Sequence, residues 1–138
     1  MSTKIQVQIS GLREFQRSLK SVDSKLGSEL RKRMNVSANI IVADAKPDIP
    51  KVTGAAASTV KARSTQLSAR VIGGGNKAPY YGWLDFGGWG GRNKKAHRPF
   101  YSEGRFIYAA YYRRRAGFFD DLERGLRELA ERSGLAVD

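Results

Sequence analysis

Residues 78–101 read APYYGWLDFGGWGGRNKKAHRPFY. This stretch holds seven of the fourteen aromatic residues in the chain, five glycines, four Lys or Arg residues and the single histidine. Aromatic side chains bury a large area and still offer a polar edge, so they dominate the energetics of cores and interfaces. Glycines and basic residues placed among them are typical of a loop and not of a core strand. We therefore predict a short anchored segment, followed by a charged arm that contacts something outside the monomer.

Residues 80–86 also fit a simpler structure, in which an aromatic strand packs on a sheet and a solvated loop follows it. We expect a strand here in either case. Residues 87–98 are predicted to form a mobile, basic, glycine-rich loop. Trp89 fits the simpler structure less well, because a glycine stands on each side of it. The residues that we expect at an intermolecular interface are Tyr80, Tyr81, Trp83, Phe86, Trp89, Arg92, Lys94, Lys95, His97, Arg98 and Phe100.

Before this stretch the sequence predicts a strand and two helices. Residues 4–9 alternate polar and apolar side chains, which is the period of a half-buried strand. In residues 12–22 the apolar side chains recur at three- and four-residue spacing, as they do on the buried face of a helix. Residues 26–45 continue this pattern over a greater length. The second helix is therefore expected to be the long central one.

The long central helix carries signals at both ends. Asp23 or Ser24 is expected to cap its start, because a short polar side chain can accept a hydrogen bond from a free N–H of the first turn. Pro47 and Pro50 are expected to end it, since proline lacks an N–H and restricts the residue before it. Residues 49–54 are then predicted to form a loop that turns at its last two residues.

Two more strands are predicted ahead of the aromatic stretch. They cover residues 58–64 and 67–72, with a tight connection near Thr65 and Gln66. Residues 73–76 read Gly-Gly-Gly-Asn and are predicted to form a loop, because such a run is too flexible for a strand interior.

The rest of the chain, residues 102–133, is expected to be mostly helical. Phe118, Phe119 and Leu122 belong to an apolar stripe at helical spacing, and Gly117 is a candidate point for a kink. Gly134 is a candidate helix stop. The order of elements predicts an α+β fold, in which a small antiparallel sheet packs against the long central helix and the C-terminal helix. We expect residues 1–138 to form a single domain.

Composition limits the classes of function. With 138 residues the chain fits one hydrophobic core. It has no cysteine, no long apolar run and no apolar segment at its start, so disulfides, thiolate metal sites, a transmembrane helix and a signal peptide are not expected. Assembly inside the cell is the expected setting, without a membrane partner. The net charge of +12 predicts attraction to nucleic acid, to an anionic membrane or to an acidic protein surface, and charge alone does not choose among the three.

The sequence offers little for catalysis. His97 lies in the predicted loop, so no base is held against a nucleophile. Asp44 and Asp48 are four residues apart near a helix end, and Asp120 and Asp121 are adjacent, but neither pair has a third candidate ligand. We therefore expect no enzyme activity, no metal and no cofactor.

Two further patterns bear on anion binding. Residues 73–77 are rich in glycine but lack the lysine–hydroxyl pair of a phosphate-binding loop. Residues 31–33 and 113–115 are runs of three basic residues on predicted helices. Three consecutive residues spread around a helix, so these runs are expected to be solvated, with contact to nucleic acid as the alternative.

Several motifs, in this order, resemble one family. Pro50, Thr53, Gly54 and Ser58 follow the long helix, as in a signature of small phage tail-completion proteins, which are also called head-to-tail connector or neck proteins. Residues 78–87 resemble that family's Ala-x-Tyr-x-x-x-x-Glu-Phe-Gly segment, with Asp85 in the acidic position. Two further matches are the Arg-Pro-Phe of residues 98–100, before the last helix, and the Gly-Leu-x-x-Phe of residues 11–15. The resemblance covers nearly the whole chain.

This resemblance implies a structural role. Members of the family are non-enzymatic subunits of long-tailed bacteriophages that form rings at the head–tail junction or the tail end. The implied partners are copies of the chain itself, in a ring expected to be six-fold, and the neighbouring neck and tail proteins. Nonspecific contact with passing DNA is also expected. The implied location is the neck or tail of the virion, after assembly in the host cytoplasm.

Two alternatives come from other classes of protein. The charge of +12 and the basic runs also fit a nucleic-acid-binding module without sequence preference. Such binding weakens steeply with salt, whereas a ring held by aromatic burial does not. The third candidate is a small nuclease of the toxin type, which lacks support because no acid–base group is visible.

Overall fold

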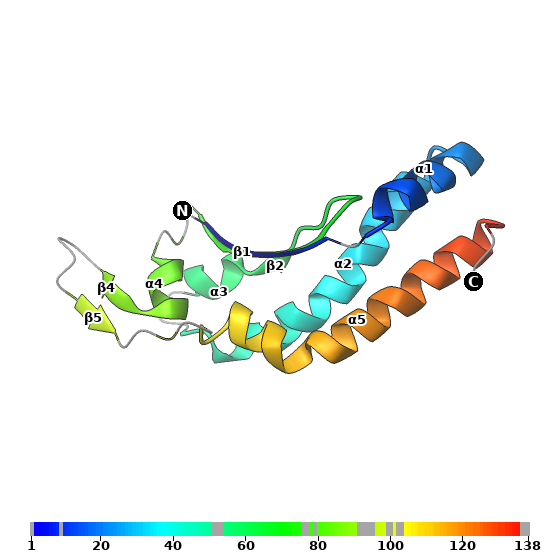
Figure 1. The fold of residues 1–138 in the computed structure, drawn as a ribbon. Helices are drawn as coiled ribbons and strands as arrows, with labels where there is room; N and C mark the ends of the chain where they lie inside the picture. The colour runs from blue at the N-terminus through cyan, green and yellow to red at the C-terminus, as the bar shows by residue number, and fades with distance from the viewer. Residues whose placement is uncertain are drawn as a thin grey trace.

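The computed structural model describes residues 2–8, 10–50, 54–75, 78, 80–90, 96–98, 101 and 104–135. A three-stranded antiparallel sheet lies against two long helices, α2 (Leu26–Ala45) and α5 (Ile107–Arg132) (Figure 1). The predicted α+β fold is confirmed, with its small sheet packed on a long central helix and a C-terminal helix. Among the described residues, no helix has the length and apolar character needed to cross a membrane.

The sheet has the order β1-β3-β2. Strand β3 (Ala69–Gly74) pairs with β1 (Ser2–Val7) on one side and with β2 (Lys61–Ala62) on the other. Ile5 lies opposite Val71, and both are buried. Because side chains alternate along a strand, the inner face of the sheet is apolar and lies against α2, while the other face carries polar side chains.

The predicted helices before the sheet are present. Helix α1 covers Leu12–Val22, and α2 follows after a short turn. The predicted cap of α2 is wrong, because its cap position is Lys25, which makes no side-chain capping bond. The Asp23 carboxylate instead accepts a hydrogen bond from the Lys25 N–H in the turn, at 2.9 Å. A 3-10 turn, η1 (Lys46–Asp48), follows α2 and contains Pro47.

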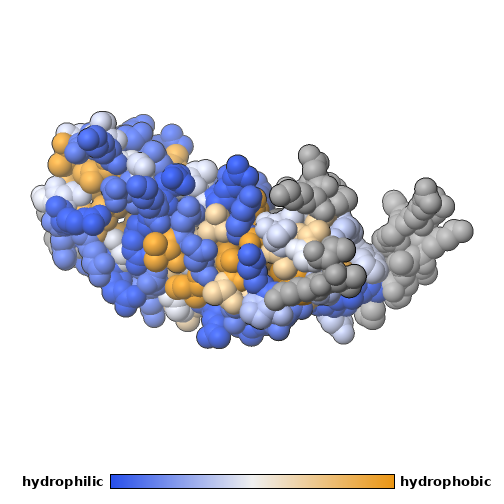
Figure 2. Space-filling view, turned by 180° about the vertical axis from the view of Figure 1, so that it is seen from behind, coloured by the Kyte–Doolittle hydropathy of each residue, from blue (hydrophilic) through white to orange (hydrophobic). Residues whose placement is uncertain are grey.

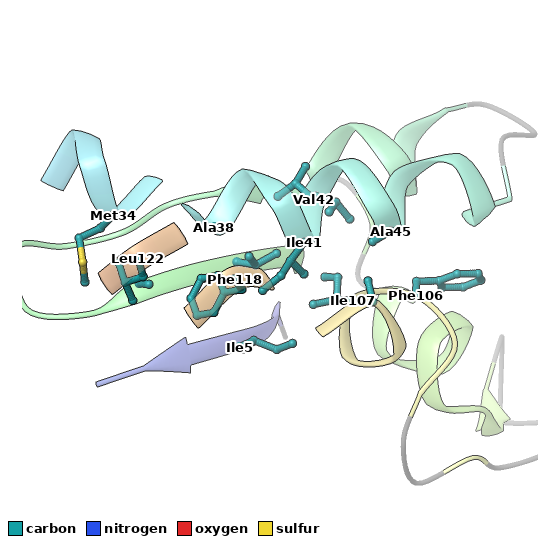
Figure 3. Close-up of a cluster of buried hydrophobic side chains, with 14 of the residues drawn as sticks. Ile5, Met34, Ala38, Ile41, Val42, Ala45, Phe106, Ile107, Phe118 and Leu122 are labelled. Atoms are coloured by element: carbon teal, nitrogen blue, oxygen red, sulfur yellow. The ribbon is translucent and has the colours of Figure 1, made fainter. Parts of the chain in front are cut away.

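Helix α5 is continuous from Ile107 to Arg132, so Gly117 does not divide it. It packs along α2, and the core lies between these helices and the inner face of the sheet (Figure 3). The apolar stripe of α5 is narrower than predicted. Phe118 is buried, but Phe119 is 41% exposed, because adjacent residues on a helix point about 100° apart.

One predicted strand is a helix, and another begins as one. Residues 55–59 form α3 (Ala55–Thr59), where three consecutive alanines favour a helix, and only β2 remains of the strand predicted over residues 58–64. Residues 81–86 form α4 (Tyr81–Phe86). Tyr81, Leu84 and Asp85 are its buried residues, at the spacing of a helix face. Short apolar runs do not distinguish a strand from a helix by periodicity alone.

The predicted glycine-rich loops are partly strands. Gly73 and Gly74 belong to β3, although residues 73–76 were predicted to be a loop. Strand β4 (Gly88–Gly90) pairs antiparallel with β5 (Ala96–Arg98), so both ends of the predicted loop of residues 87–98 are held in a hairpin. Residues 91–95 lie outside the described residues, and the predicted mobility therefore stays a prediction.

Ion pairs join α2 to α5. The Asp44 carboxylate lies 2.8 Å from Nη2 of Arg113 and 3.1 Å from Nε of Arg114. Nearer the other end, Nη1 of Arg33 lies 3.1 Å from Oδ2 of Asp121, which also accepts a hydrogen bond from the Ser37 hydroxyl at 2.8 Å. The expectation that both basic runs are solvated is therefore wrong for Arg33, whose side chain is only 20% exposed, whereas Arg113 and Arg114 stay exposed while they form these ion pairs.

The arginines lower the pKa of both carboxyl groups. For Asp44, burial alone would raise the pKa, but the hydrogen bonds and charges of Arg113 and Arg114 outweigh it. For Asp121, the hydrogen bond from Arg33 is the largest cause of the lowered pKa, and Ser37 and Arg124 add to it against the effect of burial. Both groups therefore stay ionised to lower pH than in an unfolded chain.

The pKa values of these carboxyl groups are lower in the folded protein than in the unfolded chain. The two carboxylates therefore stabilise the fold at pH values above their unfolded-state pKa, and this stabilisation disappears as the pH falls through their folded-state pKa. We expect Asp44→Asn/Asp121→Asn to lower the free energy of unfolding by about 1–2 kcal/mol at pH 7. The gap between wild type and variant should narrow between about pH 5 and pH 2. Urea unfolding followed by circular dichroism at each pH measures this, and a gap that widens in acid contradicts it.

Candidate interface around helix α4

Helix α4 joins three parts of the molecule. It packs against the sheet, its last residues lie at the start of α5, and the β4–β5 hairpin follows it directly. Figure 1 shows the hairpin at one end of an elongated molecule, with the C-terminal end of α5 at the other. The aromatic stretch singled out in the sequence therefore forms this end of the protein.

The centre of this region is the buried carboxylate of Asp85. Its Oδ1 accepts hydrogen bonds from the backbone N–H groups of Arg105 and Phe106, at 2.7 and 3.1 Å. Its Oδ2 accepts from the N–H of Ile107 and from the Tyr81 hydroxyl, both at 3.1 Å. Free N–H groups at the start of a helix favour a negative charge, so Asp85 caps α5 from outside the helix.

The tyrosines near Asp85 are held in their neutral form. Burial is the largest cause of the raised pKa of Tyr81, and the charge of Asp85 raises it further. Burial and the same charge also raise the pKa of Tyr108. The Tyr108 hydroxyl donates to the backbone carbonyl of Lys4 at 2.7 Å, which ties α5 to β1. These hydroxyls therefore act as hydrogen-bond donors that fix α4, α5 and the sheet relative to one another.

Two arginines fasten the surrounding segments to α4. Arg98, the last residue of β5, donates from Nε to the carbonyl of Leu84 at 3.1 Å, and its guanidinium lies 5.7 Å from the centre of the Trp83 ring. Arg105 donates to the carbonyl of Asp85 at 3.2 Å and lies 4.1 Å from the ring centre of Tyr101. The hairpin is therefore attached to the body through a cationic side chain over an aromatic ring.

The structure separates the predicted interface residues into groups. Tyr81 is fully buried, so its assignment to an intermolecular interface is wrong and it belongs to the core. Tyr80 is 42% exposed, while Trp83, Phe86 and Arg98 are half-buried. Phe86 also packs against Tyr108, with ring centres 4.8 Å apart. The remaining predicted residues have side chains outside the described part of the chain: Trp89, Arg92, Lys94, Lys95, His97 and Phe100.

Sequence reasoning missed several exposed apolar side chains. Val22, Val36, Tyr101 and Tyr112 are each about half exposed. Figure 2 shows hydrophobic residues gathered in the middle of one face, beside a large hydrophilic area. Tyr101 ends the aromatic stretch, and this position was the one feature of the sequence that could have identified it as an exposed side chain. The others lie in helices α1, α2 and α5, where only packing decides which apolar residue stays outside.

The carboxylates have structural partners. The four hydrogen bonds to the Asp85 carboxylate come from protein groups, and Asp44 and Asp121 are paired with arginines. Within the described ranges, no three His, Cys, Asp or Glu residues are grouped in a way that could hold a metal ion. What this region offers is a fixed platform, formed by α4 and the start of α5, from which a hairpin projects.

Comparison with known proteins found no matching family model, no similar curated protein and no similar solved structure.

Proposed function

We propose that this protein is a structural virion protein of a long-tailed bacteriophage, which forms a ring at the head–tail junction and completes the tail. The observation that carries the proposal is the ordered series of motifs resembling tail-completion proteins, which runs from residues 11–15 to residues 98–100. The acidic residue of that series, Asp85, is the buried cap of α5. Because a carboxylate at this position caps α5, the capping role explains why the motif has an acidic residue here.

The projecting hairpin supports this proposal. A ring needs a surface on one subunit that fits a different surface on the next. The β4–β5 hairpin lies at one end of the elongated body and is anchored to α4 through Arg98 (Figure 1). An anchored arm of this kind is suited to reach the neighbouring subunit.

The proposal includes partners and location. The chain acts as a single non-enzymatic domain without a cofactor, in a six-fold ring with copies of itself. It contacts neighbouring neck or tail proteins and the DNA that passes through them. It assembles in the host cytoplasm and stays in the neck or tail of the particle.

The arm provides a direct test. We expect Trp89→Ala to abolish ring formation while the melting temperature stays nearly unchanged, because Trp89 lies in β4 and serves the neighbouring subunit in this proposal. Tyr112→Ala is the matched control, since Tyr112 is an exposed aromatic residue on α5, away from the hairpin. Light scattering after size-exclusion chromatography and electron microscopy measure the assembly.

Three outcomes contradict the proposal. One is a wild-type protein that forms no ring at any concentration, alone or with a neck or tail partner. Another is equal loss of assembly in the Tyr112 control. The third is a loss of several kcal/mol of stability in Trp89→Ala, the scale for truncating a buried Trp, which would place Trp89 in the core of the monomer.

A further inference from the structure

The outer face of the sheet is strongly basic. The strand register places Lys4 and Lys61 on either side of Ile72. One alternation further along, Arg63 lies opposite Arg70, and the Arg63 N–H donates to the Arg70 carbonyl at 2.9 Å. Lys4, Lys61 and Arg63 are exposed, and the inner face of the same strands is apolar. The two neighbouring strands β2 and β3 and the distant strand β1 therefore combine their cations on one solvated face.

A pocket of about 520 Å³ opens at this face. Its lining includes the cationic side chains of Lys4, Arg31, Arg63 and Arg70, and those of Ser64 and Thr65, which bear hydroxyls. The remaining lining residue is Ile72, so the lining has no carboxylate and no aromatic ring. Every polar side chain at the pocket can donate a hydrogen bond, and no side chain there carries a negative charge.

The charges in this pocket are not neutralised by the protein. Within the described residues none of the four cations forms an ion pair, in contrast to the arginines between α2 and α5. Like charges on directly opposite residues of an antiparallel pair are unfavourable in a sheet, and Arg63 and Arg70 are placed in this way. The buried Nε of Arg70 also has no hydrogen-bond acceptor among the described residues. Buried donors of this kind are uncommon and call for an explanation.

We propose that this pocket binds phosphate groups of a nucleic-acid backbone. Guanidinium groups match the geometry of phosphate oxygens, and lysine and hydroxyl donors complete such contacts. A protein partner fits less well, because the centre of a protein–protein interface is apolar and rich in aromatic residues. The lining has no aromatic ring to stack on a base, and the Ser64 and Thr65 hydroxyls already accept hydrogen bonds from backbone N–H groups, so the pocket contacts the backbone and does not select a sequence.

This inference does not rest on the virion assignment. It concerns the sheet, whereas ring formation depends on the hairpin. Failure of phosphate binding would leave the ring proposal intact, and a protein that forms no ring could still bind nucleic acid through this pocket.

The test compares two variants of equal charge. In Arg63→Gln/Arg70→Gln two pocket cations are lost, whereas Arg13→Gln/Arg17→Gln removes two exposed cations of α1 that do not line it. Binding of a short labelled duplex of arbitrary sequence is followed by fluorescence anisotropy at several salt concentrations. We expect the pocket variant to bind at least about tenfold more weakly, with a salt slope reduced by about 2, and the α1 variant to change less than about twofold.

A second pocket variant guards against a loss of binding that is caused by misfolding. Lys4→Gln/Arg31→Gln removes two exposed cations of the pocket and leaves Arg70 in place. It should weaken binding by a similar factor at an unchanged melting temperature. Equal loss in the α1 variant overturns the proposal, because binding then follows net charge alone. So does unchanged affinity in Lys4→Gln/Arg31→Gln.

Competition distinguishes the sources of the anion. Unlabelled duplex should displace the labelled duplex at a lower concentration, per charge, than polyglutamate or inorganic tripolyphosphate. If polyglutamate competes as well as DNA, the pocket fits an acidic protein. If tripolyphosphate competes better, it fits a small free polyphosphate. Either result overturns the assignment to a nucleic-acid backbone.

Discussion

Replacing Asp85 with alanine is expected to lower the free energy of unfolding by about 4 kcal/mol. The change leaves the N–H groups of residues 105–107 and the Tyr81 hydroxyl without their acceptor, in a region where Asp85, Phe106 and Ile107 are buried. A buried donor without a partner costs about 1–3 kcal/mol, and relaxation recovers part of the sum. Urea unfolding followed by circular dichroism at pH 7 measures the difference.

Two further variants test whether the loss of stability is specific to the Asp85 carboxylate. Asp120→Ala removes an exposed carboxylate from α5 and should change stability by less than about 0.5 kcal/mol. Asp85→Asn keeps the shape and one acceptor oxygen, but turns an N–H₂ group toward donors, so we expect a loss of about 2 kcal/mol. If Asp85→Ala were as mild as Asp120→Ala, Asp85 would not be the cap that holds the start of α5.

The sequence predicts best those elements whose apolar pattern is regular and repeats several times. Residues 12–22 and 26–45 repeat their apolar side chains over several helical turns, and α1 and α2 follow those patterns. The alternation of residues 4–9 likewise predicts β1, which covers Ser2–Val7. A long pattern leaves few alternatives, because a helix and a strand would bury different residues.

Short segments were predicted less well. The six residues of α4 contain too few turns for periodicity to separate a helix from a strand, and packing against the sheet decides between them. Strands β4 and β5 are three residues each, and β4 contains two glycines, which weaken any strand signal. Neighbouring segments therefore determine these structures more than their own residues do.

The candidate sites depend on contacts between distant residues. A resemblance to a motif drew attention to Asp85, but no local pattern connects it with the N–H groups that lie twenty or more residues later. Asp44 and Arg113 meet only because α2 and α5 pack in one particular rotation. The basic face of the sheet also depends on such contacts. Alternation along each strand predicts that its cation lies on a polar face, but only the register of the three strands brings Lys4, Arg63 and Arg70 to one pocket.

The last prediction concerns the backbone beside the Asp85 carboxylate. Gly104 has a φ of 73°, which residues with a side chain rarely adopt. A Cβ at this position would collide with Oδ1 of Asp85 and lie 3.1 Å from Cβ of Tyr108. Four hydrogen bonds hold the carboxylate in place, so it has little freedom to move away. We expect Gly104→Ala to lower the free energy of unfolding by about 3 kcal/mol, through strain and the loss of part of this network.

Gly117→Ala is the same chemical change with the opposite expected sign. Gly117 lies within α5, is exposed, and has open space where a Cβ would be. Alanine is favoured over glycine in a helix by about 0.5–1 kcal/mol, so this variant should be more stable than the wild type. Urea unfolding of the two variants side by side gives both signs in one experiment. If Gly104→Ala were neutral while Gly117→Ala stabilised the protein, the start of α5 would tolerate movement, and Asp85 would not be holding it in the geometry described above.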